Sequence, residues 1–224
     1  MRRKVIFVFV VLTFAIVSSS YGYVLGDWEG SSMDGWAQSE DFYPPGNPTL
    51  TPGQTVGVTL NDNSLLMVAP IEPEPTYWDM CLDLTDDYES RAAFMANTTF
   101  EVDVTRLTDD WMEDTDPNTV TMSTFIITIW GGGPAGGFNV QPVGLCPWNG
   151  EDSTQTLSFD YADAIVASGG MLDAGWYMEI EIGTQNVGWE EGGVYYLDNA
   201  RIVPEPMTIA LLGIGGLGLL RRKR

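Results

Sequence analysis

The sequence predicts an all-β fold, an antiparallel β-sandwich, on three observations. Short segments alternate apolar and polar residues with a period of two, which is the pattern of half-buried strands. Clusters of Gly, Pro, Asn and Asp separate these segments, and only residues 88–95 have the pattern of a helix, a short one. The 224-residue chain is 44% hydrophobic and 12% aromatic, so it can build an ample core despite a net charge of −21.

The individual strands follow from the alternation. In residues 99–104 the apolar side chains face one side while Glu101 and Asp103 face the other, and 176–182 repeats this pattern. Residues 121–130 are more continuously apolar, as expected of a central strand that is buried on both faces. The predicted strands, in chain order, are 25–29, 54–60, 65–68, 78–84, 99–104, 121–130, 138–143, 154–161, 176–182 and 194–203.

Residues 1–22 have the layout of a secretory signal peptide. Arg2, Arg3 and Lys4 open the chain, an apolar run follows, and a region of small residues ends at Gly22. Because the apolar run is short for a membrane span, we expect cleavage after Gly22. The alternative is an uncleaved anchor helix.

The carboxyl end carries a second addressing segment. A proline motif is followed by a glycine-rich apolar run of about 14 residues, which as a helix would span about 21 Å against a bilayer core of about 30 Å. A basic cluster closes the chain and acts as a stop-transfer and positive-inside signal. The residues of the proline motif are Pro204, Glu205 and Pro206, and those of the basic cluster are Arg221, Arg222, Lys223 and Arg224.

With these parts in this order, residues 203–224 resemble a PEP-CTERM sorting signal, also known as an ice-binding protein C-terminal motif. The resemblance implies a bacterium that exports exopolysaccharide, and an exosortase-type membrane enzyme that recognises the proline motif and removes or replaces the tail. It also implies a precursor anchored in the inner membrane by the C-terminal helix and a mature protein at the cell surface or outside the cell. The alternative is an ordinary tail anchor. The predicted organisation is a signal peptide at 1–22, a β-sandwich domain at 23–202 and a sorting signal with a transmembrane helix at 203–224.

The charges are divided between the ends and the body. Of the ten Lys and Arg residues only Arg91, Arg106 and Arg201 lie in the body, whereas every acidic residue except Glu205 does. So acidic a body argues against a nucleic-acid partner, because phosphate contacts need Lys and Arg. The sequence contains no histidine, which excludes Ser-His-Asp and Cys-His catalysis and histidine-ligated zinc.

The two ends of the body carry a second resemblance. Residues 26–30, GDWEG, and residues 195–202, YYLDNARI, resemble the first and last strands of jelly-roll carbohydrate-binding modules and galactose-binding-like domains. The resemblance implies that these two strands lie close together. It also implies that Glu29 and Asp198 bind a structural calcium ion, with Asp27 as a third candidate ligand. The alternative is that these carboxylates are ordinary residues on the solvent side of their strands.

Tryptophans in polar loops are candidates for binding a glycan. Sugar rings stack on aromatic faces, while carboxylates and amides bind the sugar hydroxyls. Trp111, Trp148 and Trp189 lie in such contexts, although core tryptophans remain the alternative. Tryptophans inside predicted strands, such as Trp130, are assigned to the core.

Cys81 and Cys146 are an even pair in an exported chain, so we expect a disulfide between them. It would close a loop of about 65 residues and stabilise the fold by about 4 kcal/mol in the chain-entropy description. The alternative is two buried free thiols.

These features predict an exported cell-envelope or matrix protein without enzymatic activity that binds a glycan or exopolysaccharide, with calcium as structural support. One alternative is a structural envelope protein with no specific ligand. The other is a weak glycoside hydrolase that uses Glu179 and Glu181, whose Cα atoms would lie about 7 Å apart on one face of a strand.

Overall fold

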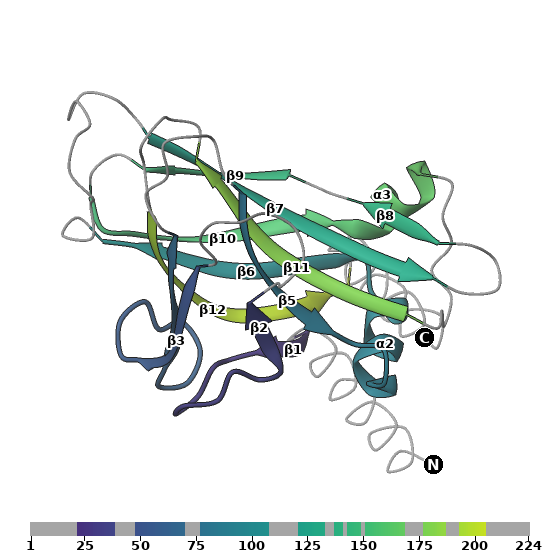
Figure 1. The fold of residues 1–224 in the computed structure, drawn as a ribbon, viewed down its shortest axis with the longest axis horizontal. Coiled ribbons are helices and arrows are strands. Elements are labelled where there is room, and N and C mark those ends of the chain that lie inside the picture. Colours follow the sequence, from purple (N-terminus) through teal and green to yellow (C-terminus); the bar gives the residue numbers. More distant parts are fainter. Residues whose placement is uncertain are drawn as a thin grey trace, which may run out of the picture.

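The computed structural model describes residues 22–38, 48–69, 77–107, 121–132, 137–140, 143–148, 151–168, 177–186 and 193–204. In these ranges the chain forms two six-stranded antiparallel sheets stacked face to face (Figure 1). The predicted all-β sandwich is therefore confirmed. The predicted signal peptide and C-terminal helix lie outside the described residues, and no helix among the described residues is long and apolar enough to cross a membrane.

Sheet A has the strand order β10-β6-β12-β4-β3, and β1 pairs with β12 off this path. Its strands are β1 (Tyr23–Gly26), β3 (Thr49–Gln54), β4 (Ser64–Ala69), β6 (Thr99–Arg106), β10 (Ser153–Asp160) and β12 (Gly193–Val203). Tyr23 lies opposite Ile202, so the first and last strands of the body are neighbours, as the second resemblance implied.

Sheet B has the strand order β2-β5-β11-β7-β8, and β9 pairs with the first half of β7. Its strands are β2 (Trp36–Gln38), β5 (Tyr77–Asp83), β7 (Thr121–Gly132), β8 (Phe138–Val140), β9 (Val143–Trp148) and β11 (Tyr177–Asn186). In Figure 1, β11 and β7 cross in front of β6 and β12, so the two sheets form separate layers.

The core lies between the two sheets and is built from the apolar positions of the alternating pattern. On the sheet A side it includes Phe100, Val102 and Val104 of β6, and each is almost completely buried. Sheet B contributes the alternate residues Ile127 and Ile129 of β7, together with their partners on β11. Complete burial of each such side chain stabilises the fold by roughly 1.5–3 kcal/mol.

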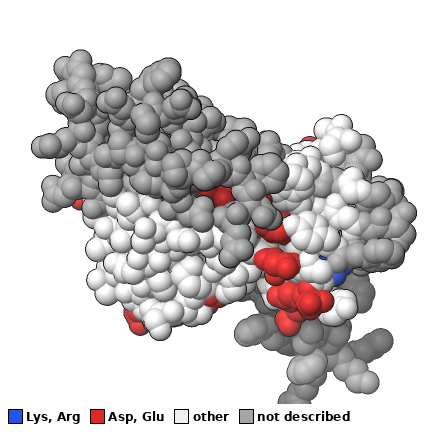
Figure 2. Space-filling model, viewed as in Figure 1, with Lys and Arg blue, Asp and Glu red and all other residues white. Residues whose placement is uncertain are grey.

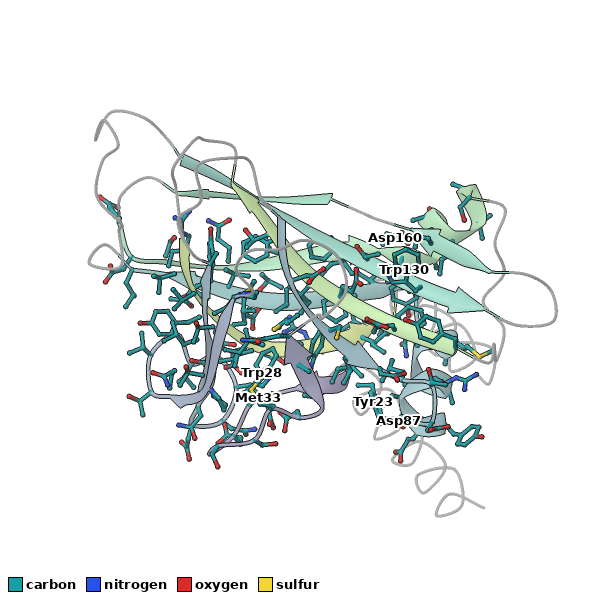
Figure 3. The ribbon with its side chains drawn as sticks, viewed as in Figure 1. Tyr23, Trp28, Met33, Asp87, Trp130 and Asp160 are labelled. Carbon is teal, nitrogen blue, oxygen red and sulfur yellow. The ribbon has the colours of Figure 1, made fainter. Side chains whose placement is uncertain are left out.

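Two short helices, α2 (Tyr88–Ala96) and α3 (Tyr161–Ala167), contact each other at one end of the sandwich. The carboxylate of Asp87 caps α2 by accepting from the backbone N–H groups of its first turn, and Ser90 Oγ donates to the hydroxyl of Tyr23 at 3.2 Å (Figure 3). The rings of Phe94 and Tyr161 stack with centroids 3.9 Å apart. Helix α2 was predicted. Helix α3 was not predicted, and it begins at Tyr161, the last residue of the predicted strand 154–161.

The segment 54–60 was predicted as a strand, and this was wrong beyond Gln54. β3 ends at Gln54, and residues 55–63 form a loop over the outer face of sheet A, called here the β3–β4 loop. Gly57 has φ +70°, and a Cβ there would lie 2.5 Å from Cβ of Tyr196. The loop therefore needs glycine at this point, both for its conformation and for its close approach to β12.

The predicted Cys81–Cys146 disulfide is not formed, because Cys81 is a free thiol. Cys81 lies on β5 and Cys146 on β9, with β11 and β7 between them. Three strand spacings amount to roughly 14 Å, whereas bridged cysteines need Cα atoms within about 7 Å. The sheet order thus prevents a bond that the even count of cysteines suggested.

We expect reducing agents to leave the stability of the protein unchanged. The thiol of Cys81 has its pKa raised to about 12 by burial and then by the negative charge and hydrogen bonding of Glu179, so it stays protonated and unreactive near neutral pH. Thermal unfolding with and without a reductant, together with Cys81→Ser, checks this. An unfolding midpoint that falls in the presence of a reductant would show that the disulfide is formed.

Candidate functional site

The outer face of sheet B, away from the core, gathers polar and aromatic side chains from three adjacent strands. Opposite residues of an antiparallel pair point to the same side of the sheet. Glu179 on β11 lies between Asp83 on β5 and Trp130 on β7. One step along, Glu181 lies between Cys81 and Thr128. We call this face, with Asp79 and Tyr177 at its two ends, the sheet B face.

The sheet B face is strongly acidic, and its groups influence one another. Burial raises the pKa of Glu181, and the charges of Asp79 and Glu179 raise it further. Burial and a hydrogen bond to Glu179 raise the pKa of Tyr177, whose hydroxyl donates to that carboxylate. The face therefore carries excess negative charge, and a fixed tyrosine–glutamate pair stands at one end of it.

Two hydrogen-bond donors of the sheet B face point toward Glu181. The hydroxyl of Thr128 and the indole N–H of Trp130 both lower the pKa of Glu181, so they lie near its carboxylate. Both donor atoms are buried, with Thr128 wholly inaccessible to solvent, and the carboxylate of Glu181 is the acceptor that they face. These two donors hold the carboxylate of Glu181 in place and partly offset the rise in its pKa.

Trp130 was assigned to the core from the sequence, and this was wrong. Its neighbours Phe125, Ile127 and Ile129 fill the core, so the period of two turns Trp130 to the opposite side, where it is half-buried (Figure 3). Strict alternation within the apolar run could have revealed this from the sequence. Trp78 lies on β5, but its side chain is not described.

The glycan-binding role of the three loop tryptophans stays a prediction. Trp111 and Trp189 lie outside the described residues. Trp148 ends β9, where it is opposite Thr121, and its side chain is not described. The residues that sequence reasoning missed are Asp79, Asp83, Tyr177 and Trp130, which only the register of the strands brings beside Glu179 and Glu181.

No strand of sheet B contains a lysine or arginine. Figure 2, viewed toward sheet B, shows acidic side chains in a band across the middle of the described surface, with very little blue. Of the three arginines of the body, Arg201 pairs with Glu101 on sheet A, Arg106 lies over the ring of Tyr195, and Arg91 donates to the carbonyl of Thr85.

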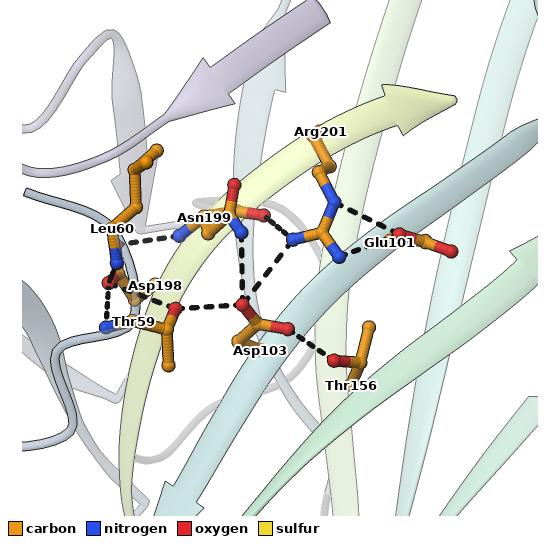
Figure 4. A network of polar contacts seen from close by, with 8 residues as sticks. All are labelled: Thr59, Leu60, Glu101, Asp103, Thr156, Asp198, Asn199 and Arg201. Carbon is orange, nitrogen blue, oxygen red and sulfur yellow. Dashed lines mark hydrogen bonds and ion pairs between the residues drawn. The ribbon is translucent and has the colours of Figure 1, made fainter. Parts of the chain in front are cut away.

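A second polar cluster lies on the outer face of sheet A, under the β3–β4 loop (Figure 4). Asp103 accepts hydrogen bonds from Thr59 Oγ1 at 2.7 Å, Thr156 Oγ1 at 2.6 Å and Asn199 Nδ2 at 3.0 Å. Arg201 Nη1 lies 3.3 Å from the same carboxylate. These donors are satisfied internally, so the cluster holds the loop on the sheet and leaves little capacity for a ligand.

We expect the free energy of unfolding of Asp103→Asn to fall less steeply than that of the wild type as the pH is lowered. Burial alone would raise the pKa of Asp103, but three hydrogen bonds and the charge of Arg201 hold it below its usual value. A lowered folded-state pKa contributes stability above the unfolded pKa of about 3.9, and this is lost as pH falls through the folded pKa. Urea unfolding from pH 7 down to pH 2 should show a shallower fall for the variant; parallel curves would contradict the assignment.

The carboxylates predicted to bind calcium all contact the β3–β4 loop. Glu29 Oε1 accepts from the N–H groups of Asp62 and Asn63, at 2.8 and 3.0 Å. Asp27 Oδ2 accepts from the amide of Asn61, and Asp198 Oδ2 accepts from the backbone of the same loop.

A calcium ion at these residues stays a prediction. Calcium needs six to eight oxygen ligands converging at 2.3–2.6 Å, about one centre. N–H groups of the β3–β4 loop occupy one oxygen of each carboxylate, and within the described ranges no three Asp, Glu, Cys or His side chains group closely enough to hold a metal. In the structure the three carboxylates act as acceptors that fasten the loop.

The predicted sorting segment begins where β12 ends. Val203 is the last residue of β12, Pro204 closes the described chain, and the rest of the proline motif and the basic cluster lie outside it. The family model described as the PEP-CTERM protein-sorting motif matches residues 203–224. This tail is a PEP-CTERM motif. It marks the chain for export and for processing through the exosortase pathway, as the sequence implied.

Solved structures similar to the body of this PEP-CTERM protein share its fold at low sequence identity. A carbohydrate-binding module specific for non-crystalline cellulose is 12% identical, with TM-score 0.54 over 82% of this chain and 94% of that chain. A carbohydrate-binding module from Caldicellulosiruptor saccharolyticus, solved with mannohexaose, is 14% identical, with TM-score 0.51 over 81% and 96%.

An exo-beta-agarase is 12% identical, with TM-score 0.53, and matches 83% of this chain. The chain spans only 26% of the agarase. The search of curated proteins found no match. At these identities the likeness shows the fold, a jelly-roll sandwich of the carbohydrate-binding-module type.

Proposed function

We propose that this PEP-CTERM protein is an exported, non-enzymatic glycan-binding protein of the cell surface or matrix, and that the sheet B face binds the glycan. One observation carries the proposal: a partly exposed aromatic pair, Tyr177 and Trp130, flanks the carboxylates of Glu179 and Glu181 on one face of a rigid sheet. Aromatic faces stack on sugar rings, and carboxylates with neighbouring donors bind sugar hydroxyls.

The fold supports this proposal. The similar carbohydrate-binding modules are sandwiches of the same kind, and one is described as cellulose-specific. A face built on strands holds its side chains more rigidly than a loop would, which lowers the entropy cost of binding. The sorting motif would deliver such a face to the outside of the cell, where exopolysaccharide is found.

Binding is tested by titrating the full chain with a panel of soluble polysaccharides and following tryptophan fluorescence and heat of binding. We expect at least one glycan to bind with a fluorescence change, and Tyr177→Ala to weaken that binding. Tyr88, an exposed aromatic on α2, provides the matched control, because Tyr88→Ala removes a similar ring away from the sheet B face. A panel without any binding, or equal loss with both variants, would contradict the proposal.

Weak glycoside hydrolysis is a second candidate, favoured by the environments of Glu179 and Glu181. Burial raises the pKa of Glu181, while Glu179 accepts a hydrogen bond from Tyr177, so the two carboxyl groups are in unlike surroundings, as in an acid–base pair. New reducing ends released from the bound glycan, and lost with Glu181→Gln, would establish this reaction. A constant reducing-end content over long incubation would exclude it.

A further inference from the structure

We propose that the end of the sandwich formed by α2 and α3, called here the helical end, lies against the lipid bilayer while the tail anchors the precursor in the membrane. The partner is a surface of neutral, zwitterionic lipid headgroups. This inference rests on the sorting motif and does not depend on the proposed glycan binding.

Both membrane-directed segments of the chain leave the fold at the helical end. The predicted signal peptide ends at Gly22, and the sorting motif begins at Val203. These two residues are in contact, because a Cβ on Gly22 would lie 2.8 Å from Cγ1 of Val203. Thr98, which follows α2, donates its N–H to the carbonyl of Val203 at 3.3 Å and accepts from the first N–H of α3 at 3.1 Å. Figure 1 shows α2 and α3 at the end of the sandwich toward which the arrow of β12 points.

The tether between the fold and the apolar run of the tail is short. Only residues 204–206 separate β12 from the apolar run, which begins at Met207. Even a fully extended chain from Val203 to Met207 spans no more than about 14 Å. Strand β6, in contrast, carries the fold about 23 Å from Thr99 at the helical end to Arg106 at the opposite end. A tail inserted in the bilayer therefore keeps the helical end beside the headgroups, while the opposite end has no such tether.

The helical end exposes large apolar side chains that suit this position. Tyr88 on α2 is 77% exposed, Val166 on α3 is 72% exposed, and Met95 on α2 is 41% exposed. The guanidinium of Arg91 lies 5.7 Å from the centre of the Tyr88 ring. Tyrosine and arginine combine an apolar body with a polar tip, which is the character of side chains at a membrane interface. Exposed apolar residues scattered singly need no partner, but these three share the tethered end of the fold.

The charge of the helical end selects neutral headgroups. Asp86, Asp87 and Glu89 lie at the start of α2, and Asp163 lies in the first turn of α3. Arg91 is the only cation in either helix. Anionic headgroups would be repelled by this excess of carboxylates, whereas zwitterionic headgroups carry no net charge to repel. Contact with the bilayer is therefore expected to weaken as the fraction of anionic lipid rises.

The test reconstitutes the full chain in phosphatidylcholine vesicles that contain a lipid with a photoreactive headgroup, and locates the labelled residues by mass spectrometry. We expect label on α2 and α3 and none on residues 151–155 at the opposite end of the sandwich. Replacing part of the phosphatidylcholine with phosphatidylglycerol should lower the labelling of both helices. Equal labelling of the two ends, labelling that rises with the anionic lipid, or a full chain that does not associate with the vesicles would overturn the inference.

Variants separate contact through the helical end from chance collisions with the bilayer. Tyr88→Asp with Val166→Asp places charges at two exposed positions of the helices, and should reduce their labelling to the level of residues 151–155. The matched control, Val56→Asp with Thr154→Asp, adds the same charge at exposed positions away from the helices and should keep the labelling. Equal loss in both double variants, or no loss in either, would contradict the inference. Tyr88→Ser alone, which should lose the label on α2, replaces the first double variant if that variant does not fold.

Discussion

Asp198→Ala is expected to lower the free energy of unfolding by about 3 kcal/mol or more, because it leaves several buried donors without an acceptor. The carboxylate of Asp198 is completely buried. It accepts from the backbone N–H of Thr59 at 2.6 Å, of Leu60 at 2.7 Å and of Asn199 at 2.7 Å, and from Thr59 Oγ1 at 3.1 Å (Figure 4). The β3–β4 loop would lose its main attachment to β12.

Urea unfolding of the wild type, Asp198→Ala and Asp198→Asn measures this effect. The asparagine variant keeps one side-chain acceptor oxygen and should lose less stability than the alanine variant. Asp86→Ala, at an exposed position before α2, controls for the loss of one negative charge. A loss for Asp198→Ala no larger than that of the control would contradict the role given to this carboxylate.

The wild type should also lose some stability as pH rises through the folded pKa of Asp198. Burial raises this pKa above the usual value, despite hydrogen bonds from Thr59, Leu60 and Asn199. A group whose folded pKa is raised stabilises the fold below its unfolded pKa, and this contribution is lost as it ionises in the folded state. Asp198→Asn should remove that component. Calcium titration tests the predicted metal site: a rise in the unfolding midpoint that disappears in Asp198→Ala would support the site, and no rise would contradict it.

Trp130→Ala is expected to weaken binding of any glycan that the wild type binds by roughly 30-fold or more, the effect of losing an aromatic hot spot. The residue lies beside Glu179 in the middle of the sheet B face, so its loss removes both a stacking surface and a donor. Affinity is measured by calorimetry with the glycan identified from the panel.

Two further variants test the role of the Trp130 ring in binding. Trp130→Phe retains an aromatic face without the indole N–H, and should recover part of the affinity. If Trp130→Ala does not fold, Tyr177→Ala replaces it, because the Tyr177 side chain is 43% exposed and makes less packing. Wild-type affinity in a folded Trp130→Ala protein would move the glycan site away from the sheet B face.

The sequence by itself determined the all-β class and the sorting motif. Periodic alternation marks strands such as β6, β10 and β11 because a side chain must face either the core or the solvent. The order of the proline motif, apolar run and basic cluster identifies the PEP-CTERM tail without any tertiary information. The helix at 88–95 was also readable, since an acidic cap at Asp87 precedes it.

Local pattern failed where backbone conformation depends on contacts from elsewhere. Residues 55–60 alternate like a strand, but they form a loop. Thr59 in this loop donates hydrogen bonds to the carboxylates of Asp103 and Asp198, which lie far away in the sequence on β6 and β12. β12 contains a register shift between Asp198 and Arg201, and Asn199 there has φ +53°. This irregularity turns Asp198, Asn199 and Arg201 toward the same polar cluster, which simple alternation does not allow.

Only the tertiary structure decided the candidate site. Glu179 and Glu181 were visible as a pair on one strand, but Asp83, Trp130 and Thr128 join them only through the order β5-β11-β7 and its register. The same order separates Cys81 from Cys146. Strand order is fixed by which apolar faces pack together over the whole sandwich, and no short stretch of sequence contains that information.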